Sequence, residues 1–371
     1  MALAAEIVIT GGPCAGKTTG MARLRQWLEE LGFRVLVAPE LATTYILGGV
    51  NDTGRLATED RPAFLVLERV VLESGVERRR YYQALAKEVY SEEQVVVLYD
   101  RGEMDIAAYV EPREFRSLLE QARLTLADVR DSYDLVVHLM TAADGAEEYY
   151  TTANNDARSE TPEQARALDA RTRDAWIGHP KLRVVDNHTD FAAKLARLMQ
   201  IVARVIELPV PTEIERKFLL TTAPDLTHSA LGTVQCVEIE QAYLKATAGE
   251  EVRIRRRYQH GGATYYQATK TRLRPGVATE QERLITPADY ERLMQLRDPA
   301  CQVVEKLRYC FIYRGQYFEL DHILAPATRE CWLLELELTE ENQVVRLPDF
   351  LRVEREVTAD SAYSNRVIAL G

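Results

Sequence analysis

The sequence predicts an α/β domain followed by a β-barrel domain: a doubly wound parallel sheet first, then antiparallel strands closed on themselves. In the first half, short β-branched apolar runs alternate with helical stretches, which is typical of a parallel sheet. In the second half, strand-like segments alternate apolar and charged residues. The length of 371 residues also exceeds what one hydrophobic core usually holds.

The expected parallel strands are short and rich in valine, isoleucine and leucine. They cover residues 7–10, 34–38, 95–99, 135–139 and 182–185. After the first of them comes an amphipathic helix, because apolar residues recur there at helical spacing: Met21, Leu24, Trp27, Leu28 and Leu31. Strand and helix enclose a loop rich in glycine.

This loop reads G-x-x-x-x-G-K-[ST], and its position between a strand and a helix is the context that a phosphate-binding P-loop requires. Backbone N–H groups of the loop and of the helix N-terminus would cradle phosphates. Lys17 would reach the β- and γ-phosphates of ATP, and Thr18 would bind Mg²⁺. The predicted nucleotide-binding residues are Gly11, Gly12, Pro13, Cys14, Ala15, Gly16, Lys17, Thr18 and Thr19.

Two acidic residues end strands of this half. Asp100 follows the third strand, where an aspartate often holds Mg²⁺ through water; an ordinary turn aspartate is the alternative. Glu40 follows the second strand, where small-molecule kinases often have a carboxylate near the acceptor. Asp100 is therefore the candidate catalytic residue of the first domain.

A helix is expected from residue 161 to 176, with Thr161 as its cap and Pro162 at its first position. Several arginines lie in or beside it, and Arg171 is the candidate ligand of the γ-phosphate. The alternative is a solvated helix face paired with acidic neighbours. These arginines are Arg158, Arg166, Arg171 and Arg173.

With Trp176 and the Gly178-His179-Pro180 turn, residues 5–200 resemble AAA-type P-loop kinases related to nicotinamide-riboside kinase domains. The resemblance implies transfer of a γ-phosphoryl group from ATP to a small nucleoside-like or other hydroxyl acceptor. It leaves the acceptor itself open.

The second half begins with Glu213-Ile214-Glu215-Arg216-Lys217 on a predicted strand. Two-residue periodicity puts Glu213, Glu215 and Lys217 on one face. Burying such a row of unlike charges is costly unless a cation and an anion satisfy it, and a divalent metal bridging phosphate oxygens would do so. The alternative is a strand face in solvent.

The same pattern recurs on later strand-like segments. It includes Arg253, Arg255 and Arg257, then Lys270, Glu280 and Glu282, Lys306 and Arg308, Asp321, and Glu335 and Glu337 between leucines. If the sheet closes into a barrel, these charges line the lumen and the leucines face outward.

From about residue 211 to the C-terminus, this order of motifs resembles the CYTH or triphosphate tunnel metalloenzyme family, including Glu356-Val357-Thr358 and Tyr363-Ser364-Asn365 near the end. The resemblance implies an eight-stranded antiparallel tunnel with flanking helices, which hydrolyses or cyclises a triphosphate with Mg²⁺ or Mn²⁺. It implies catalytic roles for Glu213, Glu215 and Lys217. It further implies metal carboxylates at Glu213, Glu215, Glu335 and Glu337, with Asp321 and Glu282 as auxiliaries, and phosphate ligands at Lys217, Arg253, Arg255, Lys270, Lys306 and Arg308.

Charge and composition limit the kinds of partner and the cellular location that the sequence predicts. The formal net charge is −11, so the arginine run at 253–257 favours a small polyanion over nucleic acid. The five cysteines have no metal-binding spacing, and we find neither a signal peptide nor a long apolar run, which together predict a cytoplasmic protein away from membranes. Two prolines, Pro209 and Pro211, suggest a boundary between a kinase-like domain at 1–207 and a tunnel domain at 211–371.

The functional hypothesis is hydrolysis of inorganic or organic triphosphate in the second domain, beside an ATP-binding, kinase-like first domain. Three alternatives remain: cyclisation of ATP to cyclic AMP, a triphosphate-binding module that regulates the kinase half, and an RNA 5′-triphosphatase. The physiological substrate, the kinase acceptor, coupling between the sites and the oligomeric state stay open at this point.

Overall fold

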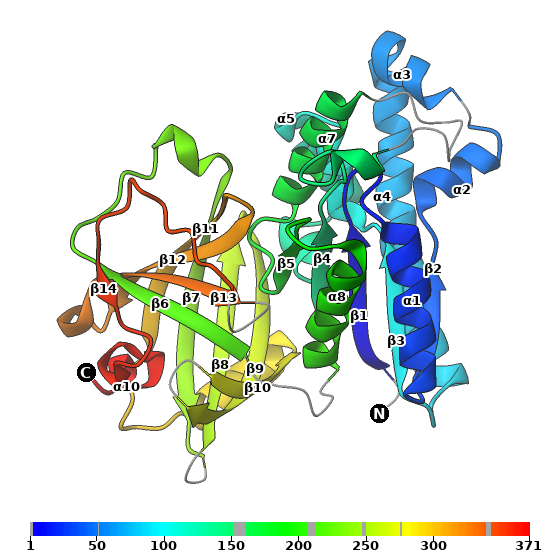
Figure 1. Cartoon of the computed structure of the whole chain (residues 1–371). Helices are drawn as coiled ribbons and strands as arrows, with labels where there is room; N and C mark the ends of the chain where they lie inside the picture. The colour runs from blue at the N-terminus through cyan, green and yellow to red at the C-terminus, as the bar shows by residue number, and fades with distance from the viewer. Residues whose placement is uncertain are drawn as a thin grey trace. The chain divides into compact units, whose positions relative to one another are not determined.

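The computed structural model describes residues 3–50, 52–150, 161–206, 213–246, 250–274, 277–338 and 343–371. The chain divides into two compact units, Met1–Ile206 and Glu207–Gly371 (Figure 1). The expected proline-containing boundary, 208–211, lies outside the described residues. Within the described part, no helix has both the length and the apolar character needed to cross a membrane.

The first unit is built on a five-stranded parallel sheet with the order β2-β3-β1-β4-β5. All five predicted strands are present, and the predicted parallel sheet is confirmed. The strands are β1 Leu3–Thr10, β2 Arg34–Ala38, β3 Val95–Asp100, β4 Leu135–Leu139 and β5 Leu182–Val185. The central strands are mostly apolar and buried, which is typical of parallel strands covered on both faces.

Helices α1 and α8 lie together on one face of this sheet, in front of it in Figure 1, and α4 packs with α5 and with the segment after β3. The predicted helix at 161–176 is confirmed as α7, and the Thr161 side chain caps it by accepting from Gln164 N. The helices are α1 Lys17–Glu30, α2 Leu41–Leu47, α3 Thr53–Glu59, α4 Arg61–Ala84, α5 Pro112–Ala122, α6 Leu126–Arg130, α7 Pro162–Ala175 and α8 Phe191–Val205. Short 3-10 or π segments are η1 Leu85–Val89, η2 Glu103–Ala108 and η3 Glu147–Tyr149.

The second unit is a nine-stranded antiparallel sheet with the order β10-β9-β8-β7-β11-β12-β13-β6-β14. Strand β10 also pairs with β6 at two positions, Val277 with Ile214 and Ala278 with Glu213. The strands are β6 Glu213–Leu220, β7 Val234–Leu244, β8 Glu250–Gln259, β9 Gly262–Arg274, β10 Val277–Leu284, β11 Val304–Tyr313, β12 Gln316–Ala325, β13 Cys331–Leu338 and β14 Val353–Glu356. The antiparallel arrangement is confirmed, whereas the predicted number of eight strands is wrong for the sheet, because the short β14 pairs with the edge of β6.

Helices α9 Pro287–Met294 and α10 Asn365–Leu370 flank this sheet, together with 3-10 segments η4 Ser229–Leu231, η5 Ala327–Arg329 and η6 Ser361–Tyr363. Tyr290 of α9 packs on Ala242 and Ile254 from β7 and β8. Ile368 and Ala369 of α10 pack with Leu219 and Leu333. The predicted flanking helices are therefore present in the described part of the unit.

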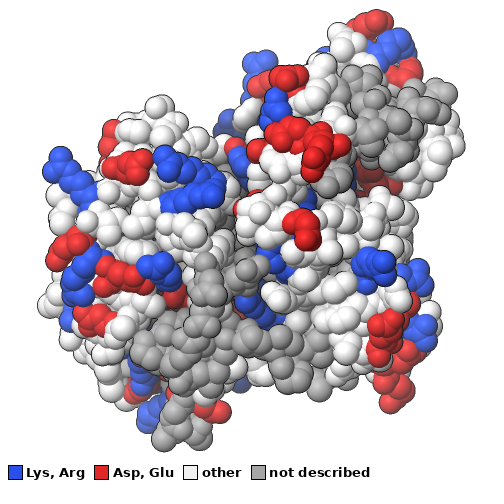
Figure 2. Space-filling view, viewed as in Figure 1, with Lys and Arg blue, Asp and Glu red and all other residues white. Residues whose placement is uncertain are grey.

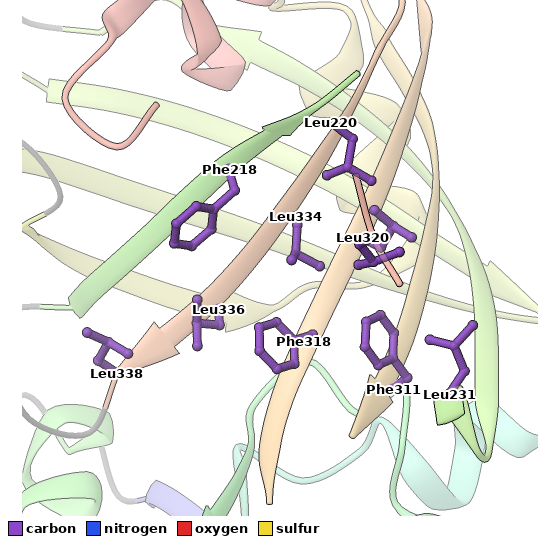
Figure 3. Packing of buried hydrophobic residues seen from close by; sticks show 10 residues of the cluster. Phe218, Leu220, Leu231, Phe311, Phe318, Leu320, Leu334, Leu336 and Leu338 are labelled. Atoms are coloured by element: carbon purple, nitrogen blue, oxygen red, sulfur yellow. The ribbon is translucent and has the colours of Figure 1, made fainter. Parts of the chain in front are cut away.

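One face of the sheet is apolar, as the alternation of leucines and charges predicts. Leu334, Leu336 and Leu338 of β13 pack with Phe218 and Phe318 from neighbouring strands (Figure 3). Since side chains alternate along a strand, Glu335 and Glu337 between these leucines belong to the opposite face. Folding therefore segregates the leucines of β13 from its carboxylates.

Charged residues of both signs are interspersed over the described surface in the view of Figure 2, where no broad basic area is seen. This distribution agrees with the acidic net charge of −11. A long nucleic acid would need a continuous basic surface to follow its backbone.

Candidate functional site

The register of the antiparallel strands brings the predicted site residues together on the charged face. Lys217 of β6 lies opposite Glu335 of β13, and Glu215 lies opposite Glu337. On the next strand pair, Arg308 lies opposite Asp321. Directly opposite residues on one face have Cβ atoms about 4.5–5.5 Å apart, close enough for their side chains to interact. The backbone pairing thus assembles residues separated by up to about 120 positions in the sequence.

Glu335 is shared by two basic side chains. Its Oε1 lies 2.6 Å from Lys217 Nζ, and its Oε2 lies 3.1 Å from Arg308 Nη2. Lys217 also contacts Glu215 Oε1 at 3.3 Å. Burial alone would lower the pKa of Lys217, but Glu215 and Glu335 outweigh it and raise that pKa above its usual range. Lys217 is therefore a charged ammonium held between two carboxylates.

The pKa of Glu215 is lowered to about 2, because the nearby Lys217 and Lys270 outweigh the opposing effect of burial. The backbone of Lys217 is fixed as well: its N–H donates to Thr358 Oγ1 at 3.0 Å, and its carbonyl accepts from Val357 N at 2.8 Å. The segment after β14, which the sequence singled out beside the motif set, thus anchors the central lysine.

Asp321 is fully buried beneath two basic side chains. Its carboxylate lies 2.5 Å from Lys306 Nζ and accepts from Arg308 Nε and Nη2, each at 2.7 Å. Despite the opposing effect of burial, these cations hold the pKa of Asp321 well below its usual range. Burial and the neighbouring Arg308 lower the pKa of Lys306 to about 8, although Asp321 opposes the shift. Asp321 therefore holds the side chains of Lys306 and Arg308 in position.

Three predicted phosphate ligands meet the E-x-E pair of β10. Glu280 lies 2.5 Å from Arg253 Nη2 and 3.3 Å from Lys270 Nζ, while Glu282 lies 3.7 Å from Arg255 Nη1. Burial, and then repulsion from Arg253, lower the pKa of Arg255. Its Nε also donates to Gln241 Oε1 at 3.4 Å. Arg253, Arg255 and Lys270 are thus each paired with a carboxylate of β10.

No functional role was assigned from the sequence to two carboxylates of the site. Glu280 stands in the same E-x-E pair as Glu282, and that pair was the available signal. Glu319 of β12 pairs with Arg308, and its position two residues before Asp321 puts both on one face. Every one of the six predicted basic ligands contacts at least one acidic partner from the following group: Glu215, Glu280, Glu282, Glu319, Asp321 and Glu335.

Among the described residues, no group of three or more acidic, histidine or cysteine side chains converges as a metal centre would. The side chain of Glu213 lies outside this description, although its backbone belongs to β6. Glu215 and Glu337 oppose each other across two strands, and Lys217 and Lys270, at 3.3 Å and 3.8 Å from Glu215, offset the repulsion between the two carboxylates. Carboxylate oxygens alone form a donor set suited to hard cations such as Mg²⁺ or Mn²⁺.

The first unit carries the predicted phosphate loop between β1 and α1. Gly11, Cys14 and Gly16 have positive φ angles of 141°, 55° and 85°, which turn the loop tightly around the helix N-terminus. Carbonyl oxygens of the loop are held from outside: Thr141 Oγ1 donates to Pro13 O at 2.5 Å, Ala142 N to Cys14 O at 3.2 Å, and Lys194 Nζ to Ala15 O at 3.2 Å. These contacts stabilise the shape of the loop.

Lys17 Nζ donates to Gly11 O at 2.7 Å and to Gly12 O at 3.0 Å. Burial and the positive charge of Arg101 lower the pKa of Lys17 to about 8. Thr18 and Thr19 are exposed in the first turn of α1. The loop thus presents a lysine and two hydroxyl-bearing residues, as the motif requires.

Asp100 ends β3 beside this loop. Burial raises its pKa, with Lys17 opposing the shift. Its Oδ1 is buried without a hydrogen-bond partner among the described residues, an arrangement that a metal-bound water would satisfy. The next residue, Arg101, has a φ of 64° and lies 2.7 Å from Glu40 through Nε. Glu40, which the sequence places near a kinase acceptor, therefore pairs with the residue that follows Asp100, and its role at an acceptor stays a prediction.

The arginines of α7 contact protein groups in this structure. Arg171 Nε donates to Ala108 O at 2.9 Å, Arg166 Nη1 donates to Ala143 O at 2.8 Å, and Arg173 pairs with Asp174. The role of Arg171 at a γ-phosphate stays a prediction. Arg158 lies outside the described residues.

Comparisons with known proteins found one matching family, two relatives and a similar solved structure. The AAA domain family matches residues 6–194. The inorganic triphosphatase of Nitrosomonas europaea is 32% identical over 161 residues, which are 43% of this chain and 97% of that protein. The inorganic triphosphatase of Acetivibrio thermocellus is 41% identical over 63 residues, which are 17% of this chain and 38% of that protein. A crystal structure of an inorganic triphosphatase has 34% identity, with 43% of this chain and 95% of that chain covered and a TM-score of 0.30.

Proposed function

We propose the following function for this chain, which belongs to the AAA domain family and to the family of the Nitrosomonas europaea inorganic triphosphatase: its second unit hydrolyses inorganic triphosphate, and its first unit binds ATP. The matched stretch of 161 residues is close in length to the second unit, Glu207–Gly371. The ordered acidic and basic pairs of that unit are the observation that supports the proposal most.

The second unit would bind triphosphate on its charged face. Three cations of this face could bind phosphate groups. Lys217 and Lys306 each carry a point charge, and Arg308 carries a planar guanidinium that can form two parallel hydrogen bonds. Carboxylates pair with these cations in the structure. Phosphate oxygens would replace the carboxylates, because both present the same anionic acceptor geometry to Arg and Lys. In this proposal the β10–β6 pairing closes the strands into a tunnel around the substrate.

The carboxylates freed in this exchange would hold Mg²⁺ or Mn²⁺. Glu215, Glu335 and Glu337, with Glu213 beside them in sequence, supply the hard oxygen donors, and Asp321 and Glu282 are auxiliary candidates. The ion would supply Lewis-acid chemistry for hydrolysis at the site that these carboxylates form. Attack of water on a terminal phosphorus atom would form phosphate and release pyrophosphate, and Lys217 and Arg308 would stabilise the charge on the transferred group.

The first unit would bind ATP through its phosphate loop, with Lys17 on the β- and γ-phosphates and Thr18 and Asp100 toward Mg²⁺. The satisfied loop carbonyls support this role, since a preorganised loop needs little rearrangement to receive phosphates. Transfer to a small hydroxyl acceptor near Glu40 and Arg101 is the kinase form of the proposal.

A product analysis tests both halves together. Purified protein is incubated with Mg²⁺ or Mn²⁺ and either tripolyphosphate or ATP, for wild type, Lys17→Ala, Glu213→Ala and Glu215→Ala. Phosphate and pyrophosphate from tripolyphosphate should persist in Lys17→Ala and disappear in the two glutamate variants. Glu354→Ala, a change at an exposed residue of β14, is the matched control and should keep full turnover.

Other products would replace the proposal with a different one. Cyclic AMP from ATP would make the second unit a cyclase. Tight binding of tripolyphosphate without turnover would make it a regulatory module, and release of phosphate only from RNA 5′-ends, with steep salt dependence, would make it an RNA triphosphatase. Loss of both activities in Lys17→Ala would indicate coupled sites.

A further inference from the structure

The phosphate loop is also contacted by a carboxylate that no motif includes. Asp169, on α7, is buried at 3% exposure. Its Oδ1 accepts from Gly12 N at 2.7 Å and from Thr141 N at 3.1 Å, and its Oδ2 lies 3.2 Å from His138 Nε2. Burial would raise the pKa of Asp169, but His138 and the Gly12 amide outweigh it and hold that pKa below its usual range. The group is thus an ionised acceptor directed at one loop amide.

The contact between Asp169 and Gly12 N also fixes the direction of the Gly11 carbonyl, because the peptide group that joins them is rigid. The Gly11–Gly12 peptide is trans, so its carbonyl and its N–H point in opposite directions. The N–H of this unit donates to Asp169, and the carbonyl, Gly11 O, accepts from Lys17 Nζ at 2.7 Å. Rotation of the peptide would break both hydrogen bonds together.

Steric fit ties Gly12 to the same carboxylate. A Cβ at Gly12 would come within 2.7 Å of Asp169 Oδ1 and 2.8 Å of Asp169 Cβ. A glycine is required here because α7 approaches the loop backbone directly. Asp169, Gly12 and Lys17 therefore form one continuous arrangement, in which α7 holds the loop from the side opposite Lys17.

We propose that Asp169 is a positioning residue for Lys17, acting through the Gly11–Gly12 peptide to set where the ammonium lies before nucleotide binds. The expected change in ATP affinity rests on the proposed ATP binding by the first unit. The expected change in the position of Lys17 does not depend on ATP binding.

The test compares Asp169→Ala with Asp169→Asn, which keeps an oxygen acceptor for Gly12 N. Two quantities are measured: the rate at which an amine-reactive reagent modifies Lys17 in ATP-free protein, by peptide mass spectrometry, and the Kd for ATP. In Asp169→Ala, both the modification rate and the Kd should rise about tenfold, the scale of one charge-assisted hydrogen bond. Asp169→Asn should restore most of each.

Asp174→Ala is the matched control, since Asp174 lies on the same helix and pairs with Arg173. It should leave both quantities at wild-type values. Modification of Lys17 at the wild-type rate in Asp169→Ala would overturn the proposal. If wild type binds no ATP, the proposed function fails, while the modification rates still decide the role of Asp169.

A measurement on the wild type covers the case in which Asp169→Ala does not fold. Hydrogen exchange should find the Gly12 amide protected in the ATP-free protein, because it donates to a buried carboxylate. Exchange of this amide at the rate of an unprotected glycine would refute the contact on which the proposal stands.

Discussion

Replacing Asp321 with asparagine removes one buried charge and keeps the side-chain volume. Two cations then lose their counter-charge. Arg308 stays charged but keeps Glu319 and Glu335, so its lost contacts should cost about 1.5–3 kcal/mol. Lys306 can avoid being a buried charge without its partner Asp321 by releasing its proton. Starting from a pKa of about 8, neutralising it costs about 1.4 kcal/mol at pH 7 and about 2.7 kcal/mol at pH 6.

The expected destabilisation is therefore about 3–4.5 kcal/mol at pH 7, in line with the cost of breaking a buried ion pair. The sign of its pH dependence follows from Lys306. Asp321 raises the pKa of Lys306 in the wild type, so the variant loses a proton that the wild type still binds below about pH 8. Above that pH, Lys306 is neutral in both proteins. The penalty should fall by more than 1 kcal/mol between pH 7 and pH 9.

Denaturant unfolding at pH 6, 7 and 9, followed by hydrogen exchange of peptides from residues 304–338, measures this loss in the second unit. Asp349→Asn is the matched control, because Asp349 is 80% exposed in its pair with Arg314 and should contribute little. A penalty that stays constant from pH 6 to pH 9, or one as small as that of Asp349→Asn, would refute the reasoning.

Three further predictions concern both units. The affinity of the first unit for ATP should fall up to about tenfold per pH unit above pH 8, because phosphate binding requires the Lys17 ammonium; calorimetry should find proton uptake on binding at pH 8.5, and Lys17→Arg should abolish it. Glu280→Gln should bind tripolyphosphate about fivefold more tightly in EDTA, because Arg253 and Lys270 lose a competing carboxylate; weaker binding in calorimetry would contradict this. Leu336→Ala should destabilise the second unit by about 2–5 kcal/mol in denaturant unfolding, whereas Leu324→Ala, at 39% exposure, should have little effect; equal losses would exclude the packing in Figure 3 as the cause.

Local pattern was enough to predict much of the fold. The apolar run that ends at Thr10 and the following glycines predict β1, the loop and α1, because all three depend on neighbours in sequence. The leucine and glutamate alternation in β13 likewise predicts that the two residue types lie on opposite faces, although the leucines expected to face outward are buried in an apolar cluster. Strand β7 was missed, although Val237 and Ile239 alternate with glutamates there, because its segment carries no motif.

Pairings over long sequence separations could not be predicted. Gly12 and Asp169 are 157 positions apart, and nothing in the α7 sequence distinguishes Asp169 from a solvated aspartate. Glu319 depends on the register between β11 and β12, which strand patterns alone do not specify. The acidic partners of the basic residues likewise depend on which strands pair. Sequence indicates the residue types of the site, whereas register determines which charge faces which.

The pairing of every predicted basic ligand with a carboxylate has a thermodynamic consequence. An arriving triphosphate alone strands the displaced carboxylates, and an arriving metal ion alone strands the displaced ammonium and guanidinium groups. When both arrive, all groups regain opposite charges. Linkage then requires that each ligand raise the affinity for the other by the same factor. Under the proposed function, this internal charge balance would make the second unit selective for the metal–triphosphate complex over either ion alone.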